Sequence, residues 1–204
     1  MFSTAYTRLD DVDWATWKAQ QLATLLFVVR DGQVLLIHKK RGLGAGKING
    51  PGGRLDNGES AMQAAIREVQ EELRVTPLGI EYSGELSFQF VDGLSIHVEV
   101  FRAGDCDGEP QETDEAKPLW APIDKIPFEQ MWADDRHWIP LMLARKKFSG
   151  RFLFDEDTML GYEIEIIETR DGRAKTVHDH NARRTQTVLK PLRQRIDEPN
   201  EKNS

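Results

Sequence analysis

The sequence predicts an α/β (α+β) domain in which helices cover both faces of a mixed central β-sheet. Short apolar runs, some continuous and some alternating with polar residues, recur along the chain and are typical of strands. Between them, residues 60–73 carry apolar side chains at the 3.6-residue period of a helix. At 204 residues, the chain is long enough for one domain with its own core.

The strands are expected to pair partly as hairpins. The predicted strands span 22–29, 33–39, 86–90, 96–100, 117–121, 152–154 and 162–167. Asp31-Gly32 separates the first two runs, and Asp92-Gly93 separates the third and fourth. Because Asp-Gly adopts the backbone conformations of tight turns, both dipeptides favour hairpins.

The helix signals are of unequal strength. Ser60 and Gln63 have the spacing of a capping box, so a helix is predicted to begin at Ser60. Its apolar stripe consists of Met62, Ala65, Ile66, Val69 and Leu73. Helical periodicity also predicts a second helix over 134–148, and a short helix is expected to start at Asp13.

Composition divides the chain into three parts and excludes several functions. We expect an N-terminal extension (1–21), one domain (22–168) and a basic, partly disordered C-terminal extension (169–204). The net charge of −7 argues against binding to a nucleic acid polymer. The longest apolar run, 25–29, is too short to span a membrane. A single cysteine and the lack of a signal-peptide pattern favour a cytoplasmic location.

The predicted helix at 60–73 carries an unusual concentration of acidic residues. Glu68, Glu71 and Glu72 lie at positions i, i+3 and i+4, where like charges repel and destabilise an isolated helix. A divalent cation would remove this repulsion, and carboxylates are the hard ligands that Mg²⁺ prefers. The alternative is a solvated acidic face on an amphipathic helix.

The residues around these acids favour the metal interpretation. Glu59 can fold back onto the same face, and Arg67 can hold a carboxylate through a bidentate ion pair. Gly52 and Gly53 allow the backbone to approach a bound ion where a side chain would obstruct it. The full pattern would arise by chance on the order of once per million chains of this length.

From Gly53 to Glu72 the pattern is G-x5-E-x7-R-E-V-Q-E-E, which resembles the signature of the Nudix hydrolases. Arg74 departs from it, since the family has glycine there as a left-handed helix cap. Arginine at this position either strains the backbone or lets the helix continue toward Pro77. Residues 24–165 are similar to the branch that hydrolyses oxidised purine nucleoside triphosphates.

The resemblance implies a Nudix fold, an α/β/α sandwich, and a Mg²⁺ cofactor for which Mn²⁺ can substitute. The implied metal ligands are the Gly52 carbonyl and Glu68, Glu71, Glu72 and Glu115. The implied catalytic residues are Glu72, Glu71, Glu68, Arg67 and Glu59. Either Glu72 or Glu71 is expected nearest the catalytic water, and their division into metal ligand and base stays open. The metal would acidify the water and stabilise charge at the attacked phosphorus.

The resemblance also implies a nucleotide pocket. Its expected residues are Thr24, Lys39, Asn49, Pro51, Gly53, Arg54, Phe88, Trp132, Asp134 and Asp135. Asn49 offers a donor and an acceptor to a purine edge, and Trp132 offers a stacking plane. Asp134 and Asp135 can share a proton and so act as donor or acceptor. Alternatively, one of them caps the following helix, and Lys39 is a solvated strand end rather than a phosphate or base contact.

The implied activity is hydrolysis of an oxidised purine triphosphate, such as 8-oxo-dGTP or 2-hydroxy-dATP, to the monophosphate and pyrophosphate. This would sanitise the nucleotide pool, and we expect a monomer. Leu43, Ile48, Pro51 and Ala133 replace residues typical of that branch, so the base identity is less constrained than the chemistry. The alternatives are a Nudix hydrolase of another nucleoside diphosphate-linked substrate and a non-catalytic nucleotide-sensing module.

Overall fold

The computed structural model describes residues 6–170 and 173–177. The helices are η1 (Leu9–Asp11), α1 (Ala61–Leu73), η2 (Phe128–Gln130) and α2 (Asp135–Leu143). The strands are β1 (Gln21–Arg30), β2 (Gln33–Lys39), β3 (Ile48–Asn49), β4 (Thr76–Leu78), β5 (Glu81–Phe90), β6 (Ser95–Ala103), β7 (Asp105–Asp107), β8 (Ala116–Pro122), β9 (Lys147–Asp155), β10 (Thr158–Arg170) and β11 (Arg173–Val177).

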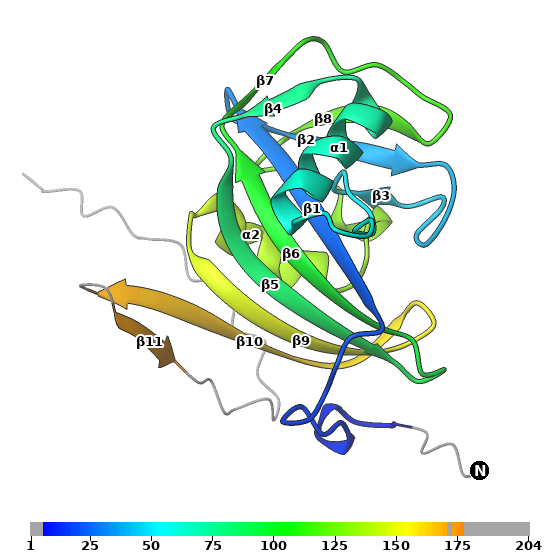
Figure 1. Cartoon of the computed structure of the whole chain (residues 1–204), viewed down its shortest axis with the longest axis vertical. Helices are drawn as coiled ribbons and strands as arrows, with labels where there is room; N and C mark the ends of the chain where they lie inside the picture. The colour runs from blue at the N-terminus through cyan, green and yellow to red at the C-terminus, as the bar shows by residue number, and fades with distance from the viewer. Residues whose placement is uncertain (1–5, 171–172, 178–204) are drawn as a thin grey trace, which may run out of the picture.

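One mixed sheet organises the fold. Its strand order is β11-β10-β9-β5-β6-β1-β2-β3, and β8 pairs with the free side of β2 (Figure 1). β1 runs parallel to β6 and β5 runs parallel to β9, whereas the other pairs in this sheet are antiparallel. β4 and β7 form a separate antiparallel pair. The predicted hairpins at Asp31-Gly32 and Asp92-Gly93 are confirmed, because each lies in the turn between two antiparallel strands.

The two long helices lie on opposite faces of this sheet. Alternate residues of β1 divide between two cores: Leu26 packs with Val69 and Leu73 of α1, whereas Phe27 packs with Trp138 of α2. Figure 1 shows α1 in front of β1 and β6, with α2 behind the sheet. The predicted sandwich with a mixed central sheet is therefore confirmed.

Local signals explain both ends of α1. Ser60 Oγ accepts a hydrogen bond from the Gln63 backbone N–H, and the Gln63 side chain accepts one from Ser60 N, which confirms the capping box. At the other end Arg74 adopts the left-handed conformation, with φ of 62°, in the role that glycine more often fills. Of the two predicted outcomes for Arg74, the strained cap is the one observed, and the helix does not continue toward Pro77.

The second helix is shorter than predicted. Helical periodicity predicted 134–148, but α2 ends at Leu143 and β9 begins at Lys147. Arg145 adopts φ of 55°, which turns the chain back toward the sheet. Phe148, the last residue of the predicted helix, instead pairs with Gly84 in the parallel β5–β9 ladder. Its apolar side chain fits both patterns, and the sheet pairing determines which one forms.

The N-terminal extension does not contain the helix expected at Asp13. The chain instead forms η1 and then a turn in which the Asp13 carboxylate accepts hydrogen bonds from Ala15 N and Thr16 Oγ1. This local side-chain bonding competes with helix formation. The division at residues 21 and 168 stays a prediction, and the predicted disorder concerns residues that lie mostly outside the described ranges.

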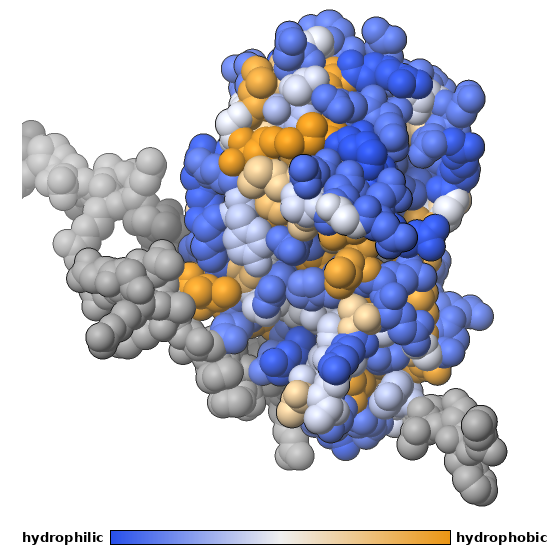
Figure 2. Space-filling model, in the orientation of Figure 1, coloured by the Kyte–Doolittle hydropathy of each residue, from blue (hydrophilic) through white to orange (hydrophobic). Residues whose placement is uncertain are grey.

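No helix in the described part of the chain is long and apolar enough to cross a membrane. The face seen in Figure 2 is mainly hydrophilic, with small separate hydrophobic areas. The large apolar side chains that are exposed are scattered along the chain: Leu22, Leu43, Met62, Leu78, Tyr82, Ile123, Leu160 and Tyr162. Isolated apolar residues of this kind are normal on protein surfaces.

Candidate active site

The loop before α1 is held against the central sheet by two glycines. Gly52 has φ of 153°, and a Cβ there would lie 2.0 Å from the Thr24 carbonyl oxygen of β1. A Cβ on Gly53 would lie 2.5 Å from Oε1 of Glu68, so the Glu68 carboxylate fills the space that a side chain would take. The sequence predicted that these glycines let the backbone approach a bound ion; in the structure the groups that come close are the Thr24 carbonyl of β1 and the Glu68 carboxylate.

Arg67 organises three of the acidic side chains. Its Nε and Nη2 donate to the two carboxylate oxygens of Glu59, each at 2.9 Å, and its Nη1 donates to Glu68 at 2.9 Å and Glu71 at 3.1 Å. Hydrogen bonds from Arg67 lower the pKa of Glu59, whereas burial raises the pKa of Glu68 despite Arg67. The expected bidentate pair thus joins Arg67 to Glu59 and draws the loop onto α1.

Glu72 is the most buried acid of the group, with 1% of its side chain exposed. Its carboxylate accepts hydrogen bonds from Gly52 N at 2.9 Å and from Lys39 Nζ at 3.1 Å. Burial raises the pKa of Glu72, and the nearby Lys39 charge opposes that rise. Lys39 Nζ also lies 3.4 Å from the Gly52 carbonyl oxygen, so an ammonium group stands between a buried carboxylate and a backbone carbonyl.

These oxygens fit a hard divalent cation. The space between Glu72 and the Gly52 carbonyl already holds a positive group, and the donors are the type that Mg²⁺ prefers. Among the described residues no three acidic, histidine or cysteine side chains are grouped as in a metal site. Arg67 and Lys39 bind the carboxylates instead. The remaining expected ligand, Glu115, pairs with Arg41 and lines the same pocket as Lys39.

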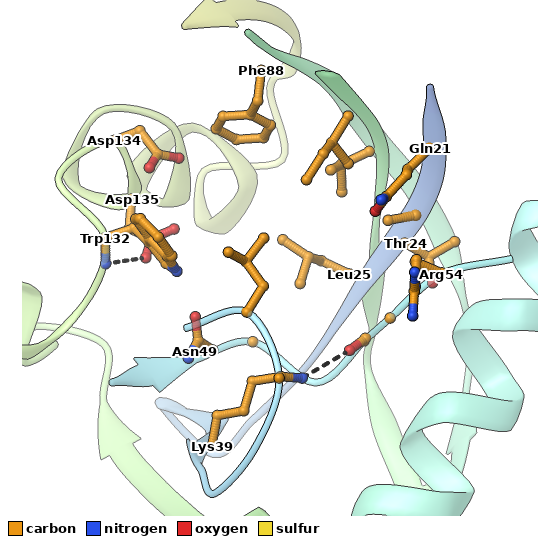
Figure 3. Close-up of a pocket in the computed structure, with 18 of the residues that line it drawn as sticks. Gln21, Thr24, Leu25, Lys39, Asn49, Arg54, Phe88, Trp132, Asp134 and Asp135 are labelled. Carbon is orange, nitrogen blue, oxygen red and sulfur yellow. Dashed lines mark hydrogen bonds between the residues drawn. The ribbon is translucent and has the colours of Figure 1, made fainter. Parts of the chain in front are cut away.

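A pocket of about 530 Å³ extends from this acidic region to the aromatic side of the sheet (Figure 3). Lys39 and Arg54 lie toward α1, whereas Phe88, Trp132, Asp134 and Asp135 lie at the far end. The lining thus joins a charged end to an apolar end with a few polar groups. Such a cavity suits an elongated ligand with one ionic and one aromatic part.

Two buried carboxyls mark the apolar end. Asp134 accepts a hydrogen bond from Trp138 Nε1 at 2.8 Å, and Asp135 accepts one from Trp132 N at 3.1 Å. Burial raises the pKa of Asp134 to about 6. Burial and the Asp134 charge raise the pKa of Asp135 well above its ordinary value. Asp134 is the N-terminal cap residue of α2 but makes no side-chain capping bond, so capping does not explain the Asp134 carboxyl.

Three polar or aromatic groups complete this end. The Asn49 amide nitrogen donates to the Gly44 and Lys47 carbonyls, each at 3.3 Å, which fixes its orientation. Trp132 packs edge-on against Phe154 and carries Lys47 Nζ 5.0 Å from its ring centroid. Thr24 Oγ1 is buried with no hydrogen-bond partner in the described structure. A hydroxyl in this state can bond to a ligand at little desolvation cost.

The structure brings nearly all predicted pocket residues into this one lining. The exception is Pro51, which is buried and whose carbonyl accepts a hydrogen bond from Leu26 N. Several lining residues were not predicted from the sequence, and they share an apolar or aromatic character: Leu25, Phe90, Leu94, Ile96, Val98 and Phe154. Strand alternation had placed part of this set on one face, but a pocket wall and a core have the same pattern.

Comparison with known proteins agrees with this geometry. Residues 19–142 match the NUDIX domain family. The chain is 47% identical over 150 residues to a Danio rerio protein named oxidized purine nucleoside triphosphate hydrolase, covering 72% of this chain and 96% of that one. A Mus musculus protein of the same name is 40% identical over 151 residues, covering 73% and 97%. A MutT protein from Bacillus halodurans is 29% identical with a TM-score of 0.63, covering 71% and 97%.

The chain therefore belongs to the Nudix family, and the family resemblance predicted from Gly53 to Glu72 is confirmed. It is a Nudix hydrolase, and enzymes of this family generally use divalent metal ions. Membership of the family does not by itself show which residues bind the metal, act as the base or bind the phosphates.

Proposed function

We propose that this protein is a Mg²⁺-dependent pyrophosphohydrolase of oxidised purine nucleoside triphosphates. Water would cleave the anhydride between the α- and β-phosphates, releasing the monophosphate and pyrophosphate. The observation that carries the proposal is the continuous pocket that joins Lys39, which bonds to Glu72 at 3.1 Å, to Trp132, Asp134 and Asp135. The names of the Danio rerio and Mus musculus relatives support the same substrate class.

At the charged end, the Gly52 carbonyl and the Glu68, Glu71 and Glu72 carboxylates would hold Mg²⁺, with Glu115 reaching in from the loop before β8. The ion would supply positive charge to the polyphosphate and acidify the attacking water. Mn²⁺ is expected to substitute because it accepts the same oxygen donors. Arg67 would keep Glu59 and Glu68 in place, since it already bonds to both carboxylates.

Lys39 and Arg54 would bind the phosphates. Both residues line the part of the pocket that lies toward α1. Lys39 Nζ lies 3.1 Å from a carboxylate oxygen of Glu72. Glu72 and the Gly52 carbonyl would bind Lys39 less strongly if they held a cation, and the Lys39 ammonium group would then be free to pair with a substrate phosphate. Lys39 would thus link cation binding to substrate binding.

At the apolar end, Phe88 and Trp132 would pack against the base while Asn49 and the Asp134–Asp135 pair read its edge. Because burial raises both aspartate pKa values, the pair is expected to hold a proton at neutral pH. One carboxyl then donates and the other accepts. By moving the proton, the pair could complement either a guanine-like or an adenine-like oxidised base.

Assembly and location are part of the proposal. A monomer is consistent with the mostly hydrophilic face in Figure 2. A cytoplasmic location fits an enzyme that acts on free nucleotides before a polymerase uses them. Gel filtration with light scattering would test the first point, and localisation of a tagged chain would test the second.

The proposal is tested by pyrophosphate release from a panel of nucleotides. The panel is 8-oxo-dGTP, 2-hydroxy-dATP, dGTP, dATP, ADP-ribose and a nucleotide sugar, each with Mg²⁺, with Mn²⁺ and with EDTA. We expect kcat/KM for an oxidised purine to exceed that for dGTP at least about tenfold, and EDTA to abolish turnover. A fast diphosphate-linked substrate would establish the other Nudix hydrolase alternative, and inactivity across the panel would favour a sensing module.

A further inference from the structure

The described part of the N-terminal extension, residues 6–20, folds into a compact segment that we call the strap. Asp11 Oδ2 accepts hydrogen bonds from Thr7 N and Arg8 N, both at 2.9 Å. Trp14 Nε1 donates to the Leu9 carbonyl at 3.1 Å, and the Trp14 and Trp17 rings lie 5.5 Å apart. These local bonds give the strap a defined shape, although it contains only η1 as regular structure.

One part of the strap packs against β9 and β10. The Arg151 guanidinium lies 5.7 Å from the Trp14 ring centroid, and a Cβ on Gly161 would lie 3.2 Å from Leu9 Cβ. Figure 1 shows the strap at the lower end of the molecule, near the hairpins that join β5 to β6 and β9 to β10. The strap is thus anchored on the sheet independently of β1, into which it leads.

The other part of the strap bonds directly to the hairpin between β5 and β6. Gln20 N donates to the Ser95 carbonyl at 3.0 Å, and Gln20 Nε2 donates to the Gly93 carbonyl at 2.9 Å. Ser95 Oγ in turn donates to the Lys18 carbonyl at 3.3 Å. These bonds fix the last residues of the turn relative to the strap.

Trp17 acts on the same turn through Gln89, which is 5% exposed. Trp17 Nε1 donates to Gln89 Oε1 at 2.9 Å, and Gln89 Nε2 donates to the carbonyls of Phe90 at 2.9 Å and Leu94 at 3.3 Å. An indole N–H can only donate, so it requires the amide oxygen to face the strap and the amide nitrogen to face the turn. Without Trp17, that buried oxygen loses its partner, which is costly.

The hairpin held in this way forms part of the wall of the proposed base site. Phe90, Leu94 and Ile96 all line the pocket, and Gln21, the residue after the strap, lines it as well. We propose that Trp17 and Gln20 are positioning residues that set the shape of the base-binding wall and so the selectivity for the purine. The selectivity in this inference rests on the proposed function. That the strap fixes the hairpin between β5 and β6 rests on the hydrogen bonds alone.

The test compares Trp17→Phe with Trp14→Phe. Both variants lose an indole N–H from the strap, but only Trp17 bonds to the residue that holds the hairpin. Gln20→Ala, at an exposed position, is a milder second variant in case Trp17→Phe fails to fold. For each protein we would measure kcat and KM for 8-oxo-dGTP and dGTP, and amide hydrogen exchange of residues 90–96 without nucleotide.

For Trp17→Phe we expect exchange in residues 90–96 to accelerate about tenfold and KM for 8-oxo-dGTP to rise about fivefold or more, with kcat within twofold. Gln20→Ala should raise the exchange rate and KM by smaller factors. Trp14→Phe should leave the exchange rate and KM near the wild-type values. Faster exchange with an unchanged KM ratio between the two nucleotides would overturn the inference, as would a fall in kcat alone. If the wild type does not prefer 8-oxo-dGTP to dGTP, the proposed function fails. The inference about the strap would then be tested by hydrogen exchange of residues 90–96 together with KM for the triphosphate that the enzyme hydrolyses best.

Discussion

The two ends of the pocket are built in different ways. At the charged end, Gly52, Gly53 and the glutamates of α1 come from one stretch of chain, and each carboxylate has a cation or backbone N–H beside it. At the apolar end, the lining residues come from β1, β3, β5, β6, β9, the loop before α2 and α2 itself. The contrast indicates that catalysis depends on one short segment in which few substitutions are tolerated. Base recognition depends instead on how strands that are distant in sequence are held together.

The largest expected effect lies at the charged end. Glu72→Gln keeps the shape and an acceptor for Gly52 N but removes the charge, and we expect kcat to fall about 10³-fold or more with KM changed little. Glu81→Gln is the matched control, since its carboxylate is 54% exposed, pairs with Arg145 and does not line the pocket. Steady-state pyrophosphate release measures both variants. A fall of less than tenfold for Glu72→Gln would place the chemistry elsewhere.

At the apolar end the matched pair is Asp135→Ala and Asp135→Asn. Alanine leaves Trp132 N unpaired and removes the edge contact, so kcat/KM for every oxidised purine should fall about 100-fold. Asparagine keeps an acceptor for Trp132 N and a fixed donor but cannot exchange a proton. It should therefore change the ratio of 8-oxo-dGTP to 2-hydroxy-dATP turnover about tenfold or more. An unchanged ratio would show that the pair does not move a proton between substrates.

Gly53→Ala tests whether the charged end depends on close packing. The new Cβ would lie 2.5 Å from Glu68, which must shift, and kcat should fall about 10- to 100-fold. Gly104→Ala is the control, since no atom lies within 4 Å of its Cβ position. Circular dichroism should be unchanged for both variants. Full activity of Gly53→Ala would mean that Glu68 is not positioned by this contact.

Asp134→Asn separates stability from recognition. Because the folded pKa of Asp134, about 6, exceeds its ordinary value of 3.8, the wild type binds more protons when folded and loses stability as pH rises from about 4 to 6. Asparagine has no such loss and still accepts from Trp138. Its free energy of unfolding should exceed that of the wild type by about 1–3 kcal/mol at pH 8 and match it near pH 4, which denaturant titrations at both pH values would measure. A difference in unfolding free energy between the two proteins that does not change with pH would contradict the raised pKa of Asp134.

The smallest expected effect concerns Leu43, an exposed residue that lines the pocket. Leu43→Phe adds aromatic surface beside the base, and KM for an oxidised purine should fall about two- to fivefold while kcat stays constant. Initial-rate kinetics with 8-oxo-dGTP would measure the change. A rise in KM would show that the base does not lie against this loop.

The sequence predicts the charged end better than the rest of the molecule for a physical reason. The spacing of Glu59, Arg67, Glu68 and Glu72 lies within one loop and helix, where local geometry determines which side chains meet. Burial of Asp134 or the pocket position of Leu94 depends instead on strand pairing far along the chain. Resemblance to a family supplied Asn49 and Trp132, which no local pattern would have connected.

The same distinction explains the errors in the fold. The length of α2 was overestimated because Phe148 suits a helix or a strand equally, and only pairing with Gly84 decides. A short helix was expected to start at Asp13, but the Asp13 carboxylate bonds to Ala15 N and Thr16 Oγ1 instead, and the strength of such local bonds cannot be judged from sequence. By contrast, the capping box at Ser60 and the Asp-Gly hairpin turns are local features, and both were predicted correctly.

The most direct test of a pocket with two separable ends is product binding without metal. Calorimetric titration of 8-oxo-dGMP and dGMP into the wild type and Glu72→Gln measures recognition in the absence of chemistry. We expect both proteins to bind 8-oxo-dGMP at least about tenfold more tightly than dGMP, and the wild type and Glu72→Gln to have equal affinity for 8-oxo-dGMP. Equal binding of the two nucleotides, or loss of 8-oxo-dGMP binding in Glu72→Gln, would contradict it.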